Sequence, residues 1–137
     1  MTDAIEAHLT SAREAMADGR PGDARNSWAR AAALSRESGA PLLQAHALRH
    51  LSDLDRAADH LEQALAHAEQ AAALYAANGQ GASLDMANAL RLKALALDAL
   101  RRTEPARQVW TAARDLYADA GVAAGVAECE ARLSAEA

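Results

Sequence analysis

Small and apolar side chains recur every three or four residues through most of the chain, and short clusters of glycine and proline interrupt them. The run of Ala64, Ala68 and Ala71, for example, places one such stripe on a single face of a helix. The clusters that favour turns lie at 19–22, 39–41, 79–81 and 121–125. The pattern therefore predicts helical segments separated by short turns.

Two further turns lack glycine and are predicted from capping residues. Asp59 is followed three residues later by Glu62, which is similar to a capping box at the start of a helix. Thr103 is followed by Pro105, and proline is favoured in the first turn of a helix. With these two turns the chain divides into seven helical segments, six of which form consecutive pairs while the last stands alone.

The end of every second helix repeats a similar short sequence. The repeated segments are 34–39, 74–79 and 116–121, and each begins with leucine and ends with glycine. The successive glycines are 40 and 42 residues apart. Self-similarity at this period, carried by helical segments, indicates a stacked helical array, and such arrays serve as binding surfaces rather than as one-piece enzyme folds.

The helix pairs resemble the tetratricopeptide repeat. That family places a small residue in the first helix of a pair, then a turn, then small, bulky and small residues at i, i+4 and i+7 of the second helix. The matching residues are Ala12, Gly19, Ala24, Trp28 and Ala31 in the first repeat, 51–54, 59–61, Ala64, Ala68, Ala71 and Leu74 in the second, and Ala94, Ala106, Trp110 and Ala113 in the third.

The resemblance implies an all-α fold, a right-handed α-solenoid of three helix pairs plus a C-terminal capping helix in one domain over 1–137. The repeats would cover roughly 3–38, 41–78 and 83–120, and the capping helix 125–135. The period exceeds the usual ~34 residues and resembles a longer variant found in signalling and regulatory proteins. Ala68 stands where the other repeats have Trp28 and Trp110, so we expect thinner packing there.

Composition supports helices and narrows the function. Hydrophobic residues make up 51% of the chain but aromatic residues only 3%, so alanine, the best helix former, supplies much of the apolar content. The net charge of −5 argues against a general nucleic-acid binder. The acidic N-terminal segment is unlike a signal peptide, and no apolar stretch is long enough to span a membrane. We expect a cytoplasmic protein that contacts neither nucleic acid nor membrane.

The rare large side chains occupy equivalent places in different repeats and are predicted to be structural. Trp28 and Trp110 fall on the stripe between helices, so we expect them in the core. Tyr75 and Tyr117 lie near the ends of second helices, where the ring can pack while the hydroxyl reaches solvent. Cys129 lies on an apolar stripe between two glutamates, which favours a buried and unreactive thiol.

No motif indicates catalysis or a cofactor. The chain has no glycine-rich phosphate loop and no serine in a nucleophile elbow, so we expect no enzyme activity, no catalytic residue and no cofactor. His46 and His50 share one helix face with Asp53, which is the spacing of a helical metal site. Such histidine pairs arise often by chance in helical proteins, and we expect no bound metal.

The resemblance places a peptide-binding site on the first helices of the repeats, which line the concave groove in tetratricopeptide arrays. The candidate residues are Arg13, His46, Arg49, His50, Asp53, Asn88, Arg91 and Asp98. Arg49 and Arg91 occupy equivalent positions 42 residues apart, and arginine binds carboxylates through two parallel hydrogen bonds. We therefore expect an adaptor that binds a peptide segment of a partner protein, and the arginines favour an acidic segment. The alternative pairs both arginines with Asp53 or Asp98 in salt bridges that bind nothing.

Two other functions remain open. Alanine-rich faces and an incomplete last repeat could let the chain stack on a second copy, which would make it a self-associating structural module and a homo-oligomer. The histidine face could instead serve a small-molecule or metal-binding protein. Leu9 and Leu92 stand where chaperone-docking members of the family carry polar residues, so their lysine- and asparagine-based clamp for a C-terminal carboxylate is not expected here.

Overall fold

The computed structural model describes residues 2–135, and this part of the chain consists of seven α-helices and no strand. The helices are α1 (Thr2–Ala17), α2 (Pro21–Glu37), α3 (Pro41–Ala57), α4 (Leu61–Ala77), α5 (Leu84–Ala99), α6 (Thr103–Asp119) and α7 (Ala123–Ala135). The all-α prediction and the seven segments are confirmed. The last helix begins at Ala123, two residues before the expected position.

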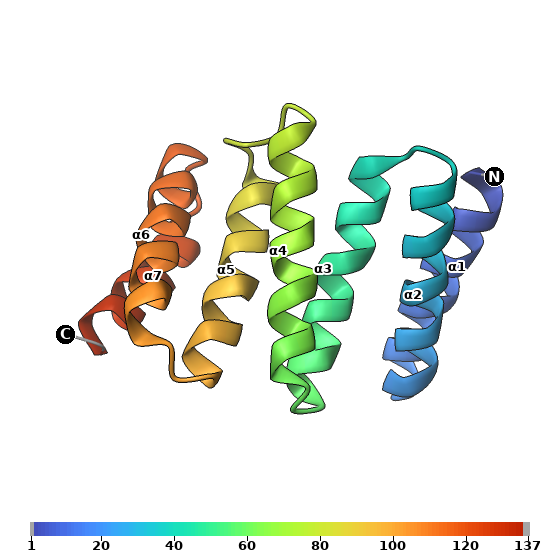
Figure 1. The fold of residues 1–137 in the computed structure, drawn as a ribbon, viewed down its shortest axis with the longest axis horizontal. Coiled ribbons are helices and arrows are strands. Elements are labelled where there is room, and N and C mark those ends of the chain that lie inside the picture. The colour runs from blue at the N-terminus through green and yellow to red at the C-terminus, as the bar shows by residue number, and fades with distance from the viewer. Residues whose placement is uncertain (1, 136–137) are drawn as a thin grey trace.

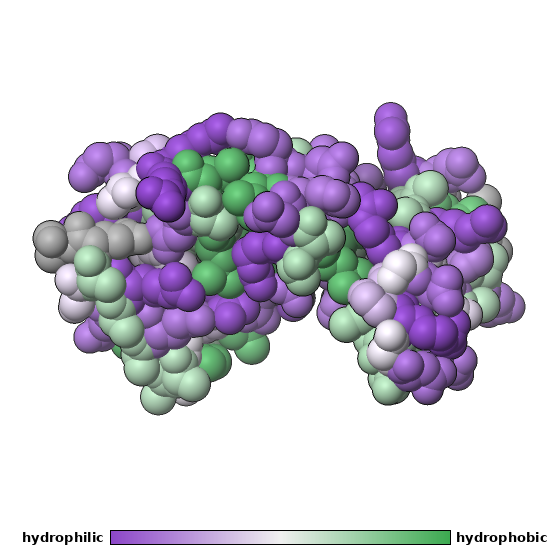
Figure 2. All heavy atoms as spheres, turned by 90° about the horizontal axis from the view of Figure 1, so that it is seen from below, coloured by the Kyte–Doolittle hydropathy of each residue, from purple (hydrophilic) through white to green (hydrophobic). Residues whose placement is uncertain are grey.

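The helices form a single row in which each one packs on its neighbours in the sequence. Figure 1 shows α1 at one end of this row and α7 at the other, with α2, α4 and α6 toward the viewer and the odd-numbered helices behind them. In addition, α3 contacts α5 directly. Figure 2 shows that the row is bent, with a hollow between the first helix pair and the C-terminal half.

Alanine fills the positions where the helices approach one another. Ala24, Ala31, Ala64 and Ala106 are completely buried and belong to two apolar clusters that together run through the row. Their small side chains allow close contact between helices, because the interaxial distance depends on the side chains at the contact. The two tryptophans are buried among them, with 2% of Trp28 and 0% of Trp110 exposed. The prediction that both tryptophans are core residues is confirmed.

All six turns between helices contain one residue with a positive φ angle. In each of them the next residue donates its backbone N–H to a carbonyl five residues earlier, as in Arg20 to Ala15 at 2.7 Å. Four of these turn residues are glycines, whereas Asp59 (64°) and Arg101 (61°) adopt the same left-handed conformation with a side chain. This arrangement satisfies the carbonyl groups at the end of the preceding helix.

This geometry shows that the predicted capping roles of Asp59 and Thr103 are wrong. Asp59 ends the turn after α3, and the N-cap of α4 is His60, whose side chain makes no capping hydrogen bond. Thr103 already lies inside α6, which follows Arg102, although Pro105 lies in the first turn as predicted. The one side-chain cap found at these helix starts, among the described residues, is at α5, where Ser83 Oγ accepts from the Met86 N–H at 3.1 Å.

Gly125 lies inside α7. The sequence pattern had predicted a turn there, because Gly125 is close to Gly121. Its lack of a side chain lets α7 approach the ring of Tyr117, because a Cβ atom at this position would overlap that ring. The glycine therefore serves the packing of α7 on α6 rather than a turn.

Candidate binding groove

Five of the eight candidate residues line one cavity on the odd-numbered helices. Arg49, His50 and Asp53 come from α3, and Asn88 and Arg91 come from α5. Together with Leu92 they enclose about 260 Å³, and we call this space the central cavity. A second cavity shares Asn88 and Arg91 and extends past Tyr117 to Glu128 on α7. We call the surface that spans both cavities the groove.

The other three candidates lie beside the groove or outside it. His46 is one helical turn from His50, and their ring centroids are 4.8 Å apart. Arg13 on α1 lies near enough for its charge to act on both histidines. Asp98 lies at the end of α5, where its carboxylate accepts a hydrogen bond from the indole N–H of Trp110 at 2.8 Å. Asp98 therefore has a structural partner and does not line the central cavity.

The two histidines pack against a tryptophan of the preceding repeat. The Trp28 ring stacks on His50 with 4.0 Å between centroids and 4° between planes, and His46 meets the same indole edge-on at 5.8 Å. Burial lowers the pKa of His50 to about 4, with further lowering by His46 and Arg49. Burial also lowers the pKa of His46. Both rings are therefore neutral near pH 7 and form an aromatic wall at one end of the groove.

Arg49 is held by one residue of its own repeat and one of the next. Its Nη1 donates to the hydroxyl of Tyr75 at 3.2 Å and to the carboxylate of Asp85 at 3.0 Å. Within residues 2–135, the buried Nε of Arg49 finds no acceptor. Arg49 thus enters the groove with only part of its donor set in use.

Arg91 is held by a two-point contact with the last helix. Its Nε donates to Glu128 Oε1 at 2.5 Å, and its Nη2 donates to Oε2 of the same carboxylate at 3.1 Å. This contact raises the pKa of Arg91 and lowers the pKa of Glu128. Beside it the Tyr117 hydroxyl donates to the Asn88 side-chain oxygen at 2.7 Å.

These contacts correct two expectations from the sequence. The arginines are neither unpaired nor bonded to Asp53 and Asp98, because Asp53 pairs with Arg56 at 2.6 Å and Asp98 with Trp110. The acids that reach the arginines come from the next odd-numbered helix, 36 and 37 residues later. The tyrosine hydroxyls also do not extend to solvent as expected, since each bonds to a side chain of the groove.

A buried carboxylate that the sequence analysis missed ties the first three helices after α1 together. Asp55 on α3 is 0% exposed, and one of its oxygens accepts from Nε of Arg25 on α2 at 2.9 Å. Its other oxygen lies 2.6 Å from Nδ1 of His67 on α4. The sequence did contain a sign of this buried carboxylate, because Asp55 follows Leu51 and Ser52 by one turn on the same face of α3.

Other candidate chemistry falls outside the groove. Cys129 is buried, which confirms that part of the prediction, and burial together with Glu128 raises its pKa to about 11, which favours the neutral thiol. Among the residues that the structure describes, no three histidine, cysteine or acidic side chains gather as a set of metal ligands.

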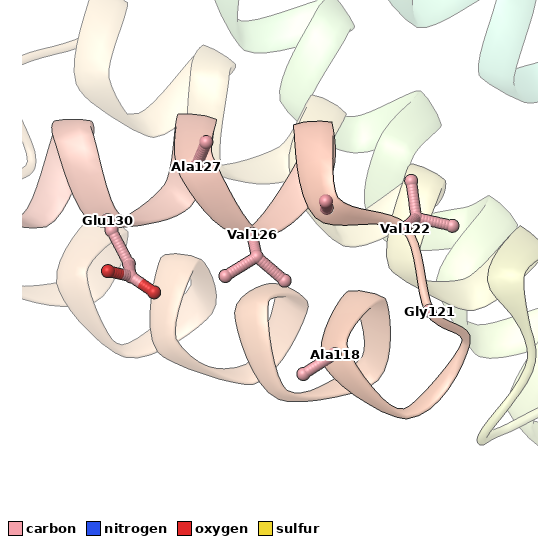
Figure 3. Close-up of a pocket in the computed structure, with 7 residues that line it drawn as sticks. Ala118, Gly121, Val122, Val126, Ala127 and Glu130 are labelled. Carbon is pink, nitrogen blue, oxygen red and sulfur yellow. The ribbon is translucent and has the colours of Figure 1, made fainter.

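The end of the row carries an apolar cleft of about 450 Å³ between α6 and α7. Figure 3 shows Val126 and Ala127 of α7 along this cleft, with Ala118 of α6 on the other side and Glu130 further along α7. Ala127 is exposed there, whereas Ala87 at the equivalent position of α5 is completely buried. The cleft is thus the face of α7 that a further helix would cover if the row continued.

Within residues 2–135, no helix combines the length and the apolar character that crossing a membrane requires. No protein-family model matches this chain, and no curated protein matches it either.

Proposed function

We propose that this chain is a tetratricopeptide-like interaction module that binds an extended acidic segment of a partner protein in the groove. The observation that carries the proposal is the central cavity, where Arg49, Asn88 and Arg91 converge from two adjacent helices. Guanidinium groups bind carboxylates strongly because several N–H donors are fixed in one plane. The neutral histidines beside them leave these arginines as the cations of the cavity.

The assignment to a right-handed solenoid of this type is part of the proposal. It is supported by the repeated turn geometry and by the small residues at the helix contacts. It is also supported by the equivalent places of Arg49 and Arg91 in successive odd-numbered helices. A module of this kind needs no catalytic residue and no cofactor, and its partner is a protein rather than a nucleic acid or a membrane.

The spacing of the helices suggests the form of the ligand. Adjacent packed helices lie about 8–10 Å apart, and an extended peptide advances about 3.3 Å per residue. Two acidic residues three positions apart would therefore match the separation of Arg49 and Arg91. A C-terminal carboxylate could supply one of the two charges, so peptides with free and amidated C-termini must be compared.

The test is a titration of ¹⁵N-labelled protein with an octapeptide of serine and glycine that carries two glutamates three residues apart. We expect the arginine Nε–H signals of Arg49 and Arg91 to shift, and the dissociation constant to rise at least tenfold in the double variant Arg49→Gln, Arg91→Gln. Added salt should also weaken binding, because exposed charges are screened. A peptide with glutamine in place of glutamate should not bind.

The matched control is the double variant Arg30→Gln, Arg36→Gln, which removes the same charge from two exposed positions of α2. Equal loss of binding in the control would mean that net charge, and not the groove, attracts the peptide. Binding that survives both substitutions in the groove, with the fold intact, would place the ligand elsewhere.

Self-association is the second candidate function, and the apolar cleft at the end of the row favours it. The exposed Ala127→Glu substitution should convert a dimer into a monomer in sedimentation experiments, whereas Ala7→Glu on the exposed face of α1 should not. A parent protein that stays monomeric at high concentration would remove this candidate.

A further inference from the structure

We infer that α7 regulates the groove, because Glu128 occupies Arg91 as a built-in carboxylate that an acidic ligand has to displace. This inference rests on the proposed function and names a competitor within the same site. Glu128 uses both of its oxygens on Nε and Nη2 of Arg91. Those are the donors that a ligand carboxylate would take in a two-point contact.

The equivalent pair at the other arginine is weaker. Asp85 contacts Arg49 through a single oxygen at 3.0 Å, and 54% of its side chain is exposed, compared with 31% for Glu128. Exposed ion pairs contribute little and exchange easily with solvent and ligands. The two arginines are thus unequally blocked, so Arg49 is the first to accept a ligand and Arg91 is released only when Glu128 leaves.

Contacts other than the ion pair of Glu128 also hold α7 in place. The helix is anchored by the buried Cys129, by the contact of Gly125 with the Tyr117 ring and by the hydrogen bond from Arg107 Nη1 to the Leu133 carbonyl at 3.0 Å. Removing the charge of Glu128 should therefore free Arg91 while α7 stays docked. A purely structural ion pair would instead loosen α7 when it is broken.

The experiment compares Glu128→Gln with Glu130→Gln, which removes the same charge from the neighbouring exposed glutamate of α7. Two measurements are made on each full-length variant. The first is the rate at which phenylglyoxal modifies Arg91, followed by mass spectrometry. The second is the dissociation constant of the diglutamate octapeptide described above.

We expect Glu128→Gln to increase the modification rate of Arg91 several-fold and to tighten peptide binding about fivefold, with the melting temperature within a few degrees of the parent. Glu130→Gln should change neither quantity by more than a factor of 1.5. In an Arg91→Gln background, Glu128→Gln should no longer tighten binding, because the competitor has lost its target. Glu128→Asp keeps the charge but shortens the side chain, and it serves as a second variant if Glu128→Gln unfolds. We expect its modification rate of Arg91 and its peptide affinity to lie between those of the parent and those expected for Glu128→Gln.

An unchanged reactivity of Arg91 in Glu128→Gln would overturn the inference, and so would tightening that persists in the Arg91→Gln background. If the parent binds the peptide but Glu128→Gln binds it no better, α7 is not a competitor although the groove is a binding site. If neither protein binds the peptide while Arg91 becomes reactive, the proposed function fails and the regulatory inference fails with it.

Discussion

A tryptophan occupies the same repeat position at two junctions of the row, the one between α2 and α3 and the one between α6 and α7. Its partner differs between the two junctions. At the first junction Trp28 stacks face to face on His50, with 4.0 Å between the rings. At the second, the guanidinium of Arg132 lies 5.6 Å from the centre of the Trp110 ring. The first contact is neutral and lies partly buried beside the groove, whereas the second uses a permanent cation at the end of the row.

The junction between α4 and α5 shows that this repeat position does not require an aromatic side chain. Ala68 and Leu92 occupy the places of the tryptophan and its partner there, and both are buried. The repeat therefore fixes where two helices meet, and the pair of side chains at that point decides whether the contact is aromatic, aliphatic or charged. The three junctions are built on one backbone pattern, and their stabilities should respond differently to substitution and pH.

The largest effect is expected from removing the tryptophan of the last junction. Trp110→Ala should lower the free energy of unfolding by about 3–5 kcal/mol, because it leaves a large cavity and removes the hydrogen-bond donor of Asp98. Chemical denaturation measures this change. A loss of less than about half a kcal/mol would mean that the indole does not pack as described.

The first junction depends in addition on the buried carboxylate of Asp55. Asp55→Ala should cost about 2–3 kcal/mol, because Arg25 and His67 lose a partner that is completely buried. The control is Asp53→Ala, which removes a half-exposed acid paired with Arg56 and should cost less than about 0.5 kcal/mol. Equal costs for the two variants would show that burial does not set the strength of the pair.

The stack on Trp28 should make the first junction sensitive to acid. The pKa of His50 is about 4 in the folded protein and near its ordinary value of 6.5 in the unfolded chain, so the unfolded state binds the proton more readily. Stability should therefore fall by about 1–2 kcal/mol as pH drops from about 6.5 to about 4. The decline measured by urea denaturation should be shallower in His50→Gln, and parallel curves would contradict this explanation.

The smallest effect is expected at the charged contact of the last junction. Arg132→Gln should reduce stability by about 0.5–1 kcal/mol, since cation–π contacts at exposed sites are worth about that much. Arg132→Lys should recover part of it. A loss as large as that of Trp110→Ala would contradict this explanation, because the half-exposed ion pair of Arg132 with Asp98 at 3.8 Å is also too weak to contribute that much.

The helices and the core were predictable from the sequence because their signals are local. The spacing of the alanines and the turn glycines can be read within one repeat, and Trp28 and Trp110 occupy the same place in two different repeats. The left-handed conformation of Asp59 and Arg101 was not predicted. A turn of this kind is defined by the end of the preceding helix, and a residue other than glycine can adopt the required conformation. For the same reason the N-cap of α6 was predicted at Thr103 but lies at Arg102.

The candidate site was only partly predictable, because its contacts cross from one repeat to the next. Repeat register brought Arg49, Asn88 and Arg91 together correctly in one cavity. The acids that hold the arginines, Asp85 and Glu128, lie on another helix and give no signal within a single repeat. The stack of Trp28 on His50 likewise depends on side-chain directions that periodicity does not specify.

Ion pairs connect α3 to α5 and α5 to α7, so each of them links residues of two different repeats. The units that keep these pairs intact therefore differ from the repeats that the turns separate. A segment exchanged at Gly39 and Gly79 would bring its own core and its own Arg49, but the acid facing that arginine would belong to the host. The unit that can be transplanted with its electrostatics intact therefore runs from one odd-numbered helix into the next. Chimeras or consensus arrays built from this chain should therefore be cut inside α5, between Asp85 and Arg91, so that each arginine stays on the same segment as its acid.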